Sequence, residues 1–206
     1  AYRLPLTAYR LPLTAYRLSL TGILMPELLI TPAQTIGPFF KHGLDWPGGE
    51  NLFPDAAPGR RIRIGGIVSD HQGRPVPDAL IEFWQADAAG RFGLARPGAS
   101  GGFGRVATDQ AGRYAINTVF PGRVDGPDGR GQAPHVLVVL FARGLLRQIV
   151  TRIYFDGEAA NREDAVLAAC GARAATLIAK RESGDANRYA WNISMQGANE
   201  TVFFEA

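Results

Sequence analysis

Residues that could do chemistry stand at the two ends of one stretch of the chain, Ala133 to Gly144. His135 lies near its start, Arg143 lies near its end, and the residues between them are Val, Leu, Phe and Ala. A metal ion in a protein needs three or four ligands, and His135 is the only histidine near the long loops that lead to this stretch. We therefore predict a core histidine whose ring bonds a backbone carbonyl, and an arginine that a strand end holds in place.

The stretch itself has the pattern of a central β-strand. It is a continuous apolar run rich in Val and Leu, and a Pro opens it, which strands tolerate at their first residues. A buried helix is the alternative, but the valines and the flanking Pro and Gly favour a strand covered on both faces. Strand geometry places Leu137, two residues along, on the same face as His135.

Further strands follow from short apolar or alternating runs separated by turn residues. Residues 60–68 alternate basic and apolar side chains, with a possible bulge at Gly65 or Gly66. Residues 148–155 are expected to pair antiparallel with the central strand. The remaining expected elements are strands at 79–84, 175–180 and 189–196, a hairpin of 105–108 with 113–119, and helical turns at 164–170. About seven or eight strands, spaced by roughly ten residues, predict an all-β fold, an antiparallel β-sandwich.

Two long glycine-rich loops, residues 86–102 and 121–132, lead toward the central strand. Long loops inside a compact domain are usually functional or disordered, so this end of the fold is the candidate site. Its donors are few, because neither loop contains a tyrosine. The chain also lacks the sequence patterns of a serine-hydrolase elbow, a zinc protease or a nucleotide-binding loop, so none of these sites is expected.

Composition and charge limit the classes of function. The sequence has 206 residues, 46% of them hydrophobic. It lacks the run of about 18 apolar residues that a membrane span needs, so no membrane role is expected. The pI near 9.3 comes from Arg3, Arg10 and Arg17, because the remainder carries 19 basic and 19 acidic residues. No basic patch with interleaved aromatics indicates nucleic-acid binding. Cys170, the only cysteine, cannot form an internal disulfide, which fits a reducing compartment, the cytoplasm.

The chain divides into three parts. Residues 1–24 contain three copies of a heptad, Ala-Tyr-Arg-Leu-Pro-Leu-Thr and its variant, in which proline breaks any long helix. We expect this part to be disordered, and Met25 could be the true start. Residues 25–59 form an arm and a loop rich in Pro and Gly, and residues 60–206 form the sandwich. The arm could lie as a strap on its own core or could reach a partner or a pocket, and the sequence leaves both open.

Several segments together carry a family resemblance. They are Trp-Gln-Ala-Asp-Ala-Ala-Gly-Arg-Phe at 84–92, Gly-Arg-Val-Ala-Thr-Asp-Gln-Ala-Gly-Arg-Tyr at 104–114, Val-Phe-Pro-Gly-Arg-Val at 119–124, the central stretch, and Thr-Arg-Ile-Tyr-Phe-Asp at 151–156. With the arm at 31–40 and the terminal Glu-Thr-Val-Phe-Phe, they resemble the intradiol ring-cleaving dioxygenases over residues 25–206. The resemblance implies a transthyretin-like β-sandwich. In two-chain members of that family, a beta chain binds non-haem Fe(III) with two Tyr and two His, and a related alpha chain has lost that site.

The resemblance implies that this chain is of the alpha type and binds no iron itself. The positions of the family's iron ligands correspond here to Phe92, Val124, His135 and Leu137. Phe92 lacks the phenolate oxygen, and Val124 and Leu137 offer no donor to a hard ion such as Fe(III). One ligand of the set remains, so Fe(III) is expected in a partner beta chain.

By the same resemblance, this chain would form one wall of the substrate pocket on the beta chain. Thr35, Gly37, Pro38 and Arg143 correspond to positions that line it, and the substrates would be protocatechuate and O2. The guanidinium of Arg143 could pair with the carboxylate of protocatechuate. A solvated arginine at a strand end is the alternative.

Arg147 and Arg152, which follow the central strand, are expected to be surface charges. The competing function is a stand-alone transthyretin-like module that binds a small aromatic molecule in a pocket around His135. Activity that appears only after mixing with a beta chain would favour the dioxygenase subunit, whereas tight aromatic binding by the lone chain would favour the module.

Overall fold

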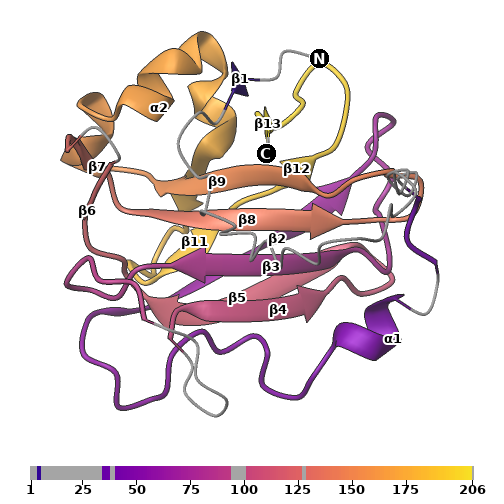
Figure 1. The fold of residues 1–206 in the computed structure, drawn as a ribbon, viewed down its shortest axis with the longest axis horizontal. Helices are drawn as coiled ribbons and strands as arrows, with labels where there is room; N and C mark the ends of the chain where they lie inside the picture. Colours follow the sequence, from indigo (N-terminus) through magenta and orange to yellow (C-terminus); the bar gives the residue numbers. More distant parts are fainter. Residues whose placement is uncertain (1–3, 6–33, 38–39, 94–100, 127–128, 206) are drawn as a thin grey trace, which may run out of the picture.

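The fold is built almost entirely of strands (Figure 1). The computed structural model describes residues 4–5, 34–37, 40–93, 101–126 and 129–205. The strands are β1 (Leu4–Pro5), β2 (Arg61–Ser69), β3 (Leu80–Gln85), β4 (Phe103–Ala107), β5 (Arg113–Val119), β6 (Val124–Asp125), β7 (Gly131–Gln132), β8 (His135–Phe141), β9 (Ile149–Phe155), β10 (Ile178–Arg181), β11 (Arg188–Ala190), β12 (Ile193–Ser194) and β13 (Phe204–Glu205). The helices are α1 (Phe40–Leu44) and α2 (Ala165–Ala169), with 3-10 helices at Ala159–Arg162 and Gly171–Leu177. The all-β prediction is confirmed. No helix in the described part of the chain is long and apolar enough to cross a membrane.

The strands form one continuous, nearly closed sheet of mixed direction. Its hydrogen-bonded path runs β12-β2-β11-β10-β9-β8-β3-β4, with β5 added on β2 and β13 on β9, while β6 and β7 form a separate ribbon. β10 runs parallel to β9, and β11 and β12 run parallel to β2. The prediction of a purely antiparallel sheet is therefore wrong. The helical connection from β9 to β10 allows the parallel return, because a parallel crossover needs about a dozen residues or more.

One predicted hairpin does not form. β4 pairs antiparallel with β3, and β5 pairs antiparallel with β2, although β4 and β5 are neighbours in the sequence. The turn between them therefore carries the chain from one part of the sheet to another, and the predicted hairpin of 105–108 with 113–119 is wrong. A tight glycine turn has the same sequence signature whether or not its two flanking strands pair with each other.

The predicted bulge at Gly65 or Gly66 is also wrong. The register of β2 with β5 runs without interruption from Arg61 to Ile67, and no extra residue is inserted along this fully described strand. A Cβ on Gly66 would lie 1.7 Å from the carbonyl oxygen of Trp191. The glycine therefore permits a close approach between β2 and the segment that follows β11.

β8 is central, as predicted, because it pairs antiparallel with β3 on one side and with β9 on the other. Val136, Val138 and Leu140 are fully buried in the main core, whereas Leu137, Val139 and Phe141 on the alternate side are only partly covered. In β9, by contrast, every residue from Val150 to Phe155 is buried. The second face of β9 packs in a smaller cluster beside α2, made of residues such as Tyr154, Leu167, Leu177, Val202 and Phe204.

A short segment before β2 covers the gap between β4 and β5, and we call it the strap (residues 49–52). The backbone N–H of Arg105 in β4 donates to the carbonyl of Gly49 at 2.9 Å, and Leu52 N–H donates to the carbonyl of Asn117 in β5 at 3.0 Å. A parallel bridge also joins Asn51 to Asn117. The strap lies within residues 25–59, which were expected to form an arm and a loop.

The late elements are close to their predicted positions. The predicted helical turns at 164–170 contain α2, and Asp164 caps its N-terminus. Residues 175–177 belong to a 3-10 helix, so the predicted strand at 175–180 begins only at Ile178. The predicted strand at 189–196 is divided into β11 and β12, because the Asn192 side chain bonds the N–H of Ile67 between them at 3.0 Å.

The N-terminal part is described only in pieces. β1 lies inside the heptad repeat and pairs in parallel with β13. The rest of residues 1–24, Met25 and the arm residues up to 33 lie outside the described residues, so the predicted disorder and the predicted start remain predictions. In Figure 1, α2 lies at the side where β8 begins, and α1 lies at the side where β8 ends.

Candidate functional site

His135, the first residue of β8, is a core histidine. Its side chain is buried, and Nδ1 lies 2.8 Å from the carbonyl oxygen of Ala133. Because a carbonyl only accepts, we assign the proton to Nδ1. Burial, assisted by the positive charge of Arg152, lowers the pKa of His135 to about 4. The predicted bond between this ring and a backbone carbonyl is confirmed, and the imidazole is neutral at neutral pH.

Arg152, on β9, is buried and was predicted wrongly as a surface charge. Only 1% of the residue is exposed. One guanidinium nitrogen, Nη1, donates to Oε1 of Gln132 and to the hydroxyl of Tyr154, each at 3.2 Å. The burial has a simple cause: β9 is covered on one face by the main core and on the other by the cluster beside α2, so no side chain of its middle reaches solvent.

Asp164 completes this buried network and joins it to the backbone. The Tyr154 hydroxyl donates to Oδ1 of Asp164 at 3.3 Å, and burial raises the pKa of that hydroxyl. Oδ2 accepts from the N–H of Ala133 at 2.8 Å, while Oδ1 also caps α2 by accepting from the N–H groups of Val166 and Leu167. One carboxylate therefore fixes the start of β8, the start of α2 and the tyrosine that contacts Arg152.

Two of the predicted vestigial metal positions flank this network with side chains that carry no donor atom. Val124, in β6, pairs with Gln132 of β7, and Leu137, in β8, lies opposite Arg152 of β9. Together with His135, three of the four predicted positions are thus paired with, or adjacent to, residues of the buried network. Phe92 differs, because it lies in the loop after β3 with 49% of its surface exposed.

The residues at this end of β8 do not fit Fe(III). Val124 and Leu137 carry no ligand atom, which leaves His135 as the one donor at these positions, and a guanidinium occupies the interior next to it, so an added cation would be repelled. In the described part of the chain, no group of three or more His, Cys, Asp or Glu side chains is placed to hold a metal ion.

Arg143 lies at the other end of β8, in the tight turn that follows the strand. The N–H of Leu145 donates to the carbonyl of Ala142 at 3.2 Å, and Gly144 has a φ of +88°, a conformation that glycine adopts most easily. The Arg143 side chain is 58% exposed, and its Nη2 lies 3.8 Å from Oδ2 of Asp78. The neighbouring Arg147 is also exposed, as predicted.

The arm lies against this same turn. The N–H of Gly144 donates to the hydroxyl of Thr35 at 2.8 Å, which joins the arm to the turn that carries Arg143. The Phe40 and Phe141 rings pack with centroids 5.2 Å apart, so α1 is held against the end of β8. Gly37 is exposed nearby in sequence, and Pro38 lies outside the described residues. Two of the four predicted substrate residues, Thr35 and Arg143, are thus brought together.

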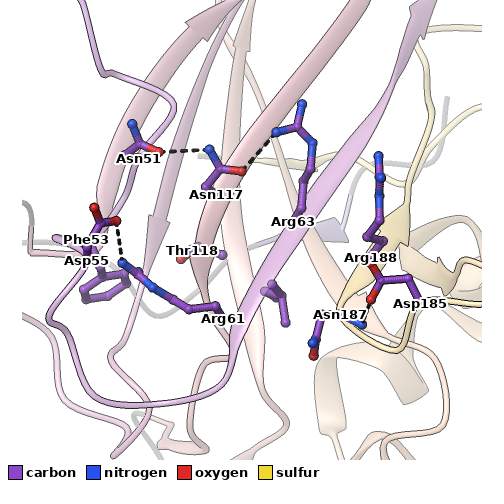
Figure 2. Close-up of a pocket in the computed structure, with 11 residues that line it drawn as sticks. Asn51, Phe53, Asp55, Arg61, Arg63, Asn117, Thr118, Asp185, Asn187 and Arg188 are labelled. Carbon is purple, nitrogen blue, oxygen red and sulfur yellow. Dashed lines mark hydrogen bonds and ion pairs between the residues drawn. The ribbon is translucent and has the colours of Figure 1, made fainter.

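Two hollows differ in character. A small one of about 120 Å³ lies between the arm and the end of β8, lined among others by Ile36, Phe40, Phe141, Leu145 and Leu146. A larger polar groove of about 480 Å³ crosses β2 and β5 (Figure 2). There the Arg61 side chain pairs with Asp55 at 3.2 Å and Arg63 donates to Asn117 at 3.1 Å, so these cations already have partners within the chain.

The fold and the two ends of β8 agree with a family of known enzymes. A family model described as Dioxygenase matches residues 36–197. The chain belongs to this family, the intradiol ring-cleaving dioxygenases. Among its relatives, the protocatechuate 3,4-dioxygenase alpha chain of Burkholderia cepacia is 42% identical over 200 residues, which cover 88% of this chain and all of that one. The beta chain of the same species is 31% identical over 82% of this chain and 77% of that one.

Solved structures agree with this assignment. The dioxygenase domain of a carbohydrate-binding fusion protein from Streptomyces sp. SirexAA-E has 27% identity and a TM-score of 0.60, covering 82% of this chain and 99% of that one. The 3-chlorocatechol 1,2-dioxygenase of Rhodococcus opacus 1CP has 19% identity and a TM-score of 0.56, covering 84% and 70% of the two chains. At that identity the second likeness concerns the fold alone.

Two residues of interest were missed by sequence reasoning. Asp164 could have been found, because an Asp before a helical run is a common N-cap, but its bonds to Tyr154 and Ala133 depend on the tertiary fold. Asp78 gave no signal beyond its place in a turn rich in Pro. Its neighbours Lys41 and Arg143 come from distant parts of the sequence, and only the structure places all three together.

Proposed function

We propose that this chain is the non-catalytic alpha-type subunit of an enzyme that cleaves protocatechuate with O2 between its hydroxyl-bearing carbons, giving 3-carboxy-cis,cis-muconate. A beta chain would carry the Fe(III) and the oxygen chemistry. The observation that carries the proposal is the contrast along β8. Its start holds a buried guanidinium where a metal centre would need donors, and its end exposes Arg143 beside the arm.

In this proposal Arg143 recognises the carboxylate of protocatechuate across the chain interface. A guanidinium presents several N–H donors in a planar fork that matches a carboxylate. The turn after β8 is fixed by its bond to Thr35, so the base of the Arg143 side chain is fixed as well. Thr35, Gly37 and Pro38 would form the adjacent part of the pocket wall, and they would exclude water from the carboxylate side of the substrate.

The proposal extends to the fold. We propose that the curled sheet corresponds to the two-layer sandwich of the intradiol enzymes, with the partner beta chain built on the same plan. Support comes from the 31% identity between this chain and a beta chain, and from the likeness to the solved dioxygenase domain from Streptomyces. Two related chains could then meet so that the arm and Arg143 of one border the metal site of the other.

The deciding experiment is to purify this chain alone, a matching beta chain alone, and the two together after co-expression. We expect iron and ring cleavage in the co-expressed complex, and neither in this chain alone. Iron bound stoichiometrically by the lone chain, or a complex that fails to form, would contradict the proposal. Full activity of the beta chain without this chain would show that the alpha-type subunit is not required.

The competing function, a stand-alone module that binds an aromatic molecule around His135, finds less support in the structure. The His135 ring already packs against Tyr154, with centroids 5.6 Å apart, and Arg152 fills the interior beside them. An aromatic ligand would have to displace this network. Titration of the lone chain with protocatechuate tests this directly, and tight binding would favour the module.

A further inference from the structure

Asp78 has an unusual backbone conformation. It is the only non-glycine residue with positive φ in the described part of the chain, at +62°. It follows Pro77 in the turn before β3. Gly or Asn adopts the left-handed backbone conformation of this position more easily than Asp does. An outlier of this kind, held in place by its surroundings, is a reason to ask what its side chain does.

The carboxylate of Asp78 lies between two cations from different parts of the chain. Lys41, in α1, places Nζ 3.4 Å from Oδ1, and Arg143 places Nη2 3.8 Å from Oδ2. The three side chains are 25%, 58% and 38% exposed for Lys41, Arg143 and Asp78, so the cluster lies at the surface. Each oxygen serves one cation, and the cluster retains a net positive charge.

We propose that Asp78 is a positioning residue that orients the Arg143 guanidinium toward an anionic substrate and holds α1 at the same edge. This inference rests on the proposed function. The separation of 3.8 Å is an ion-pair contact and not a hydrogen bond, so it restrains the guanidinium without consuming its N–H groups. Those donors stay available to a carboxylate on the substrate.

Lys41 makes this arrangement compatible with an anionic substrate. A carboxylate next to the pocket would repel the carboxylate of protocatechuate if it were unpaired. Lys41 offsets the charge of Asp78, so the potential near Arg143 stays positive. The bond from Gly144 to Thr35 fixes the backbone of the turn, and the ion pair with Asp78 restrains the direction of the Arg143 side chain.

The test is Asp78→Asn in the complex with the beta chain. Asn keeps the size of the side chain and tolerates positive φ, so the fold should be retained while the charge is removed. We expect the KM for protocatechuate to rise about twofold to fivefold, in line with loss of an exposed ion pair, with little change in kcat. Catechol, which lacks the carboxylate, should show an unchanged KM.

Two controls make the result specific. In an Arg143→Ala background, Asp78→Asn should have no further effect, because there is no guanidinium left to orient. Asp55→Asn removes another exposed aspartate, which pairs with Arg61 at 3.2 Å in the groove across β2 and β5. This variant should leave the KM values for both substrates unchanged.

An unchanged or lowered KM for protocatechuate, or an equal rise for both substrates, would overturn the role of Asp78 while leaving the proposed subunit function intact. An effect of Asp78→Asn that persists in full after Arg143→Ala would also overturn it. A wild-type complex that does not form, or does not cleave protocatechuate, would instead be a failure of the proposed function itself.

Discussion

At the start of β8 the charged side chains are buried and linked through the Tyr154 hydroxyl, whereas at its end, roughly 20 Å away for a strand of this length, Arg143 is exposed and keeps donors free. Arg152 and Arg143 are the same type of residue at these two ends. Arg152 is confined by Gln132 and Tyr154, while Arg143 has only a loose contact with Asp78. Position within the sheet, and not residue type, decides which arginine serves the fold and which can serve a ligand.

We call the start of β8, with its buried network, the closed end, and the turn after β8, with Arg143, the open end. A charged side chain is buried at the closed end, which costs free energy, and none is buried at the open end. Burying a guanidinium is costly unless its N–H groups find partners, and Nε of Arg152 has none among the described residues. The arrangement therefore depends on the bonds that remain, above all those of Asp164. The open end can lose a side chain without leaving a buried polar group unpaired. Substitutions at the two ends should differ accordingly.

The largest effect is expected from Asp164→Ala at the closed end. The change removes the cap of α2 and leaves the buried N–H of Ala133 without its acceptor. It also removes the negative charge of the buried network. We expect a loss of about 3 kcal/mol or more in the free energy of unfolding, measured by urea denaturation. Asp156→Ala, at an exposed pair with Lys180, is the matched control. A loss below about 1 kcal/mol would show that the closed end is not held as described.

The next effect is expected from Arg143→Ala at the open end, and it should appear in kinetics and not in stability. Loss of a charged hydrogen-bond donor should lower kcat/KM for protocatechuate, by an amount that corresponds to roughly 1.5 to 3 kcal/mol in activation free energy. The kcat/KM for catechol should fall much less. Arg147→Ala, in the same connection, is the control. Equal losses on both substrates, with a changed subunit ratio by gel filtration, would mean that Arg143 holds the interface together.

A smaller effect at the closed end comes from His135. Its pKa is lowered to about 4 in the folded chain against 6.5 for a free side chain, so below pH 6.5 the unfolded chain binds a proton that the folded chain does not. Folding stability should thus fall as the pH decreases from about 6.5 to about 4. Between pH 7 and pH 5 the loss should be about 2 kcal/mol.

Urea denaturation at pH 7 and pH 5 tests this prediction. The loss should be absent from His135→Gln and should persist in His42→Gln, which changes an exposed histidine of α1 at the open end. If His135→Gln keeps the full pH dependence, the buried imidazole is not its source.

The smallest effect is expected where neither end of β8 is changed. Deletion of residues 1–24 removes the heptad repeat, of which Leu4–Pro5 pairs with β13. The repeat has no apolar stripe with which to pack, so we expect the melting temperature and the yield of the complex with the beta chain to be unchanged. A marked drop in either would show that the repeat contributes to the fold or to assembly.

The sequence predicted individual strands better than their partners. The apolar runs of β3 and β9 were predicted within one residue and that of β8 within three, because burial imposes a direct pattern on composition. Pairing depends on contacts between distant segments, so the β4–β5 hairpin and the purely antiparallel sheet were wrong. The prediction that Arg152 is a surface charge was wrong for a similar reason. Its neighbours in sequence did not show that a second layer, α2 and its flanking turns, covers β9.

The site was predicted through the family resemblance more than through the pattern of residues. The prediction that His135 is a core histidine followed from the scarcity of other metal ligands near it, and its bond to the carbonyl of Ala133 agrees with that prediction. Thr35 and Arg143 were named from the resemblance alone, and the structure places them at one turn. Asp78 was not named at all, because a bend with positive φ at an aspartate is set by the folded chain and leaves no distinctive pattern.

The strap has a consequence for solubility during folding. An exposed strand edge is a template for pairing with another molecule and so for aggregation. The strap occupies the outward backbone groups of both β4 and β5 at Arg105 and Asn117, so two strand edges are covered by one short piece of the same chain. Until that piece is in place, both edges are open to neighbouring molecules. A truncated chain that begins after residue 52 should therefore be prone to aggregation, although every strand of its core is present.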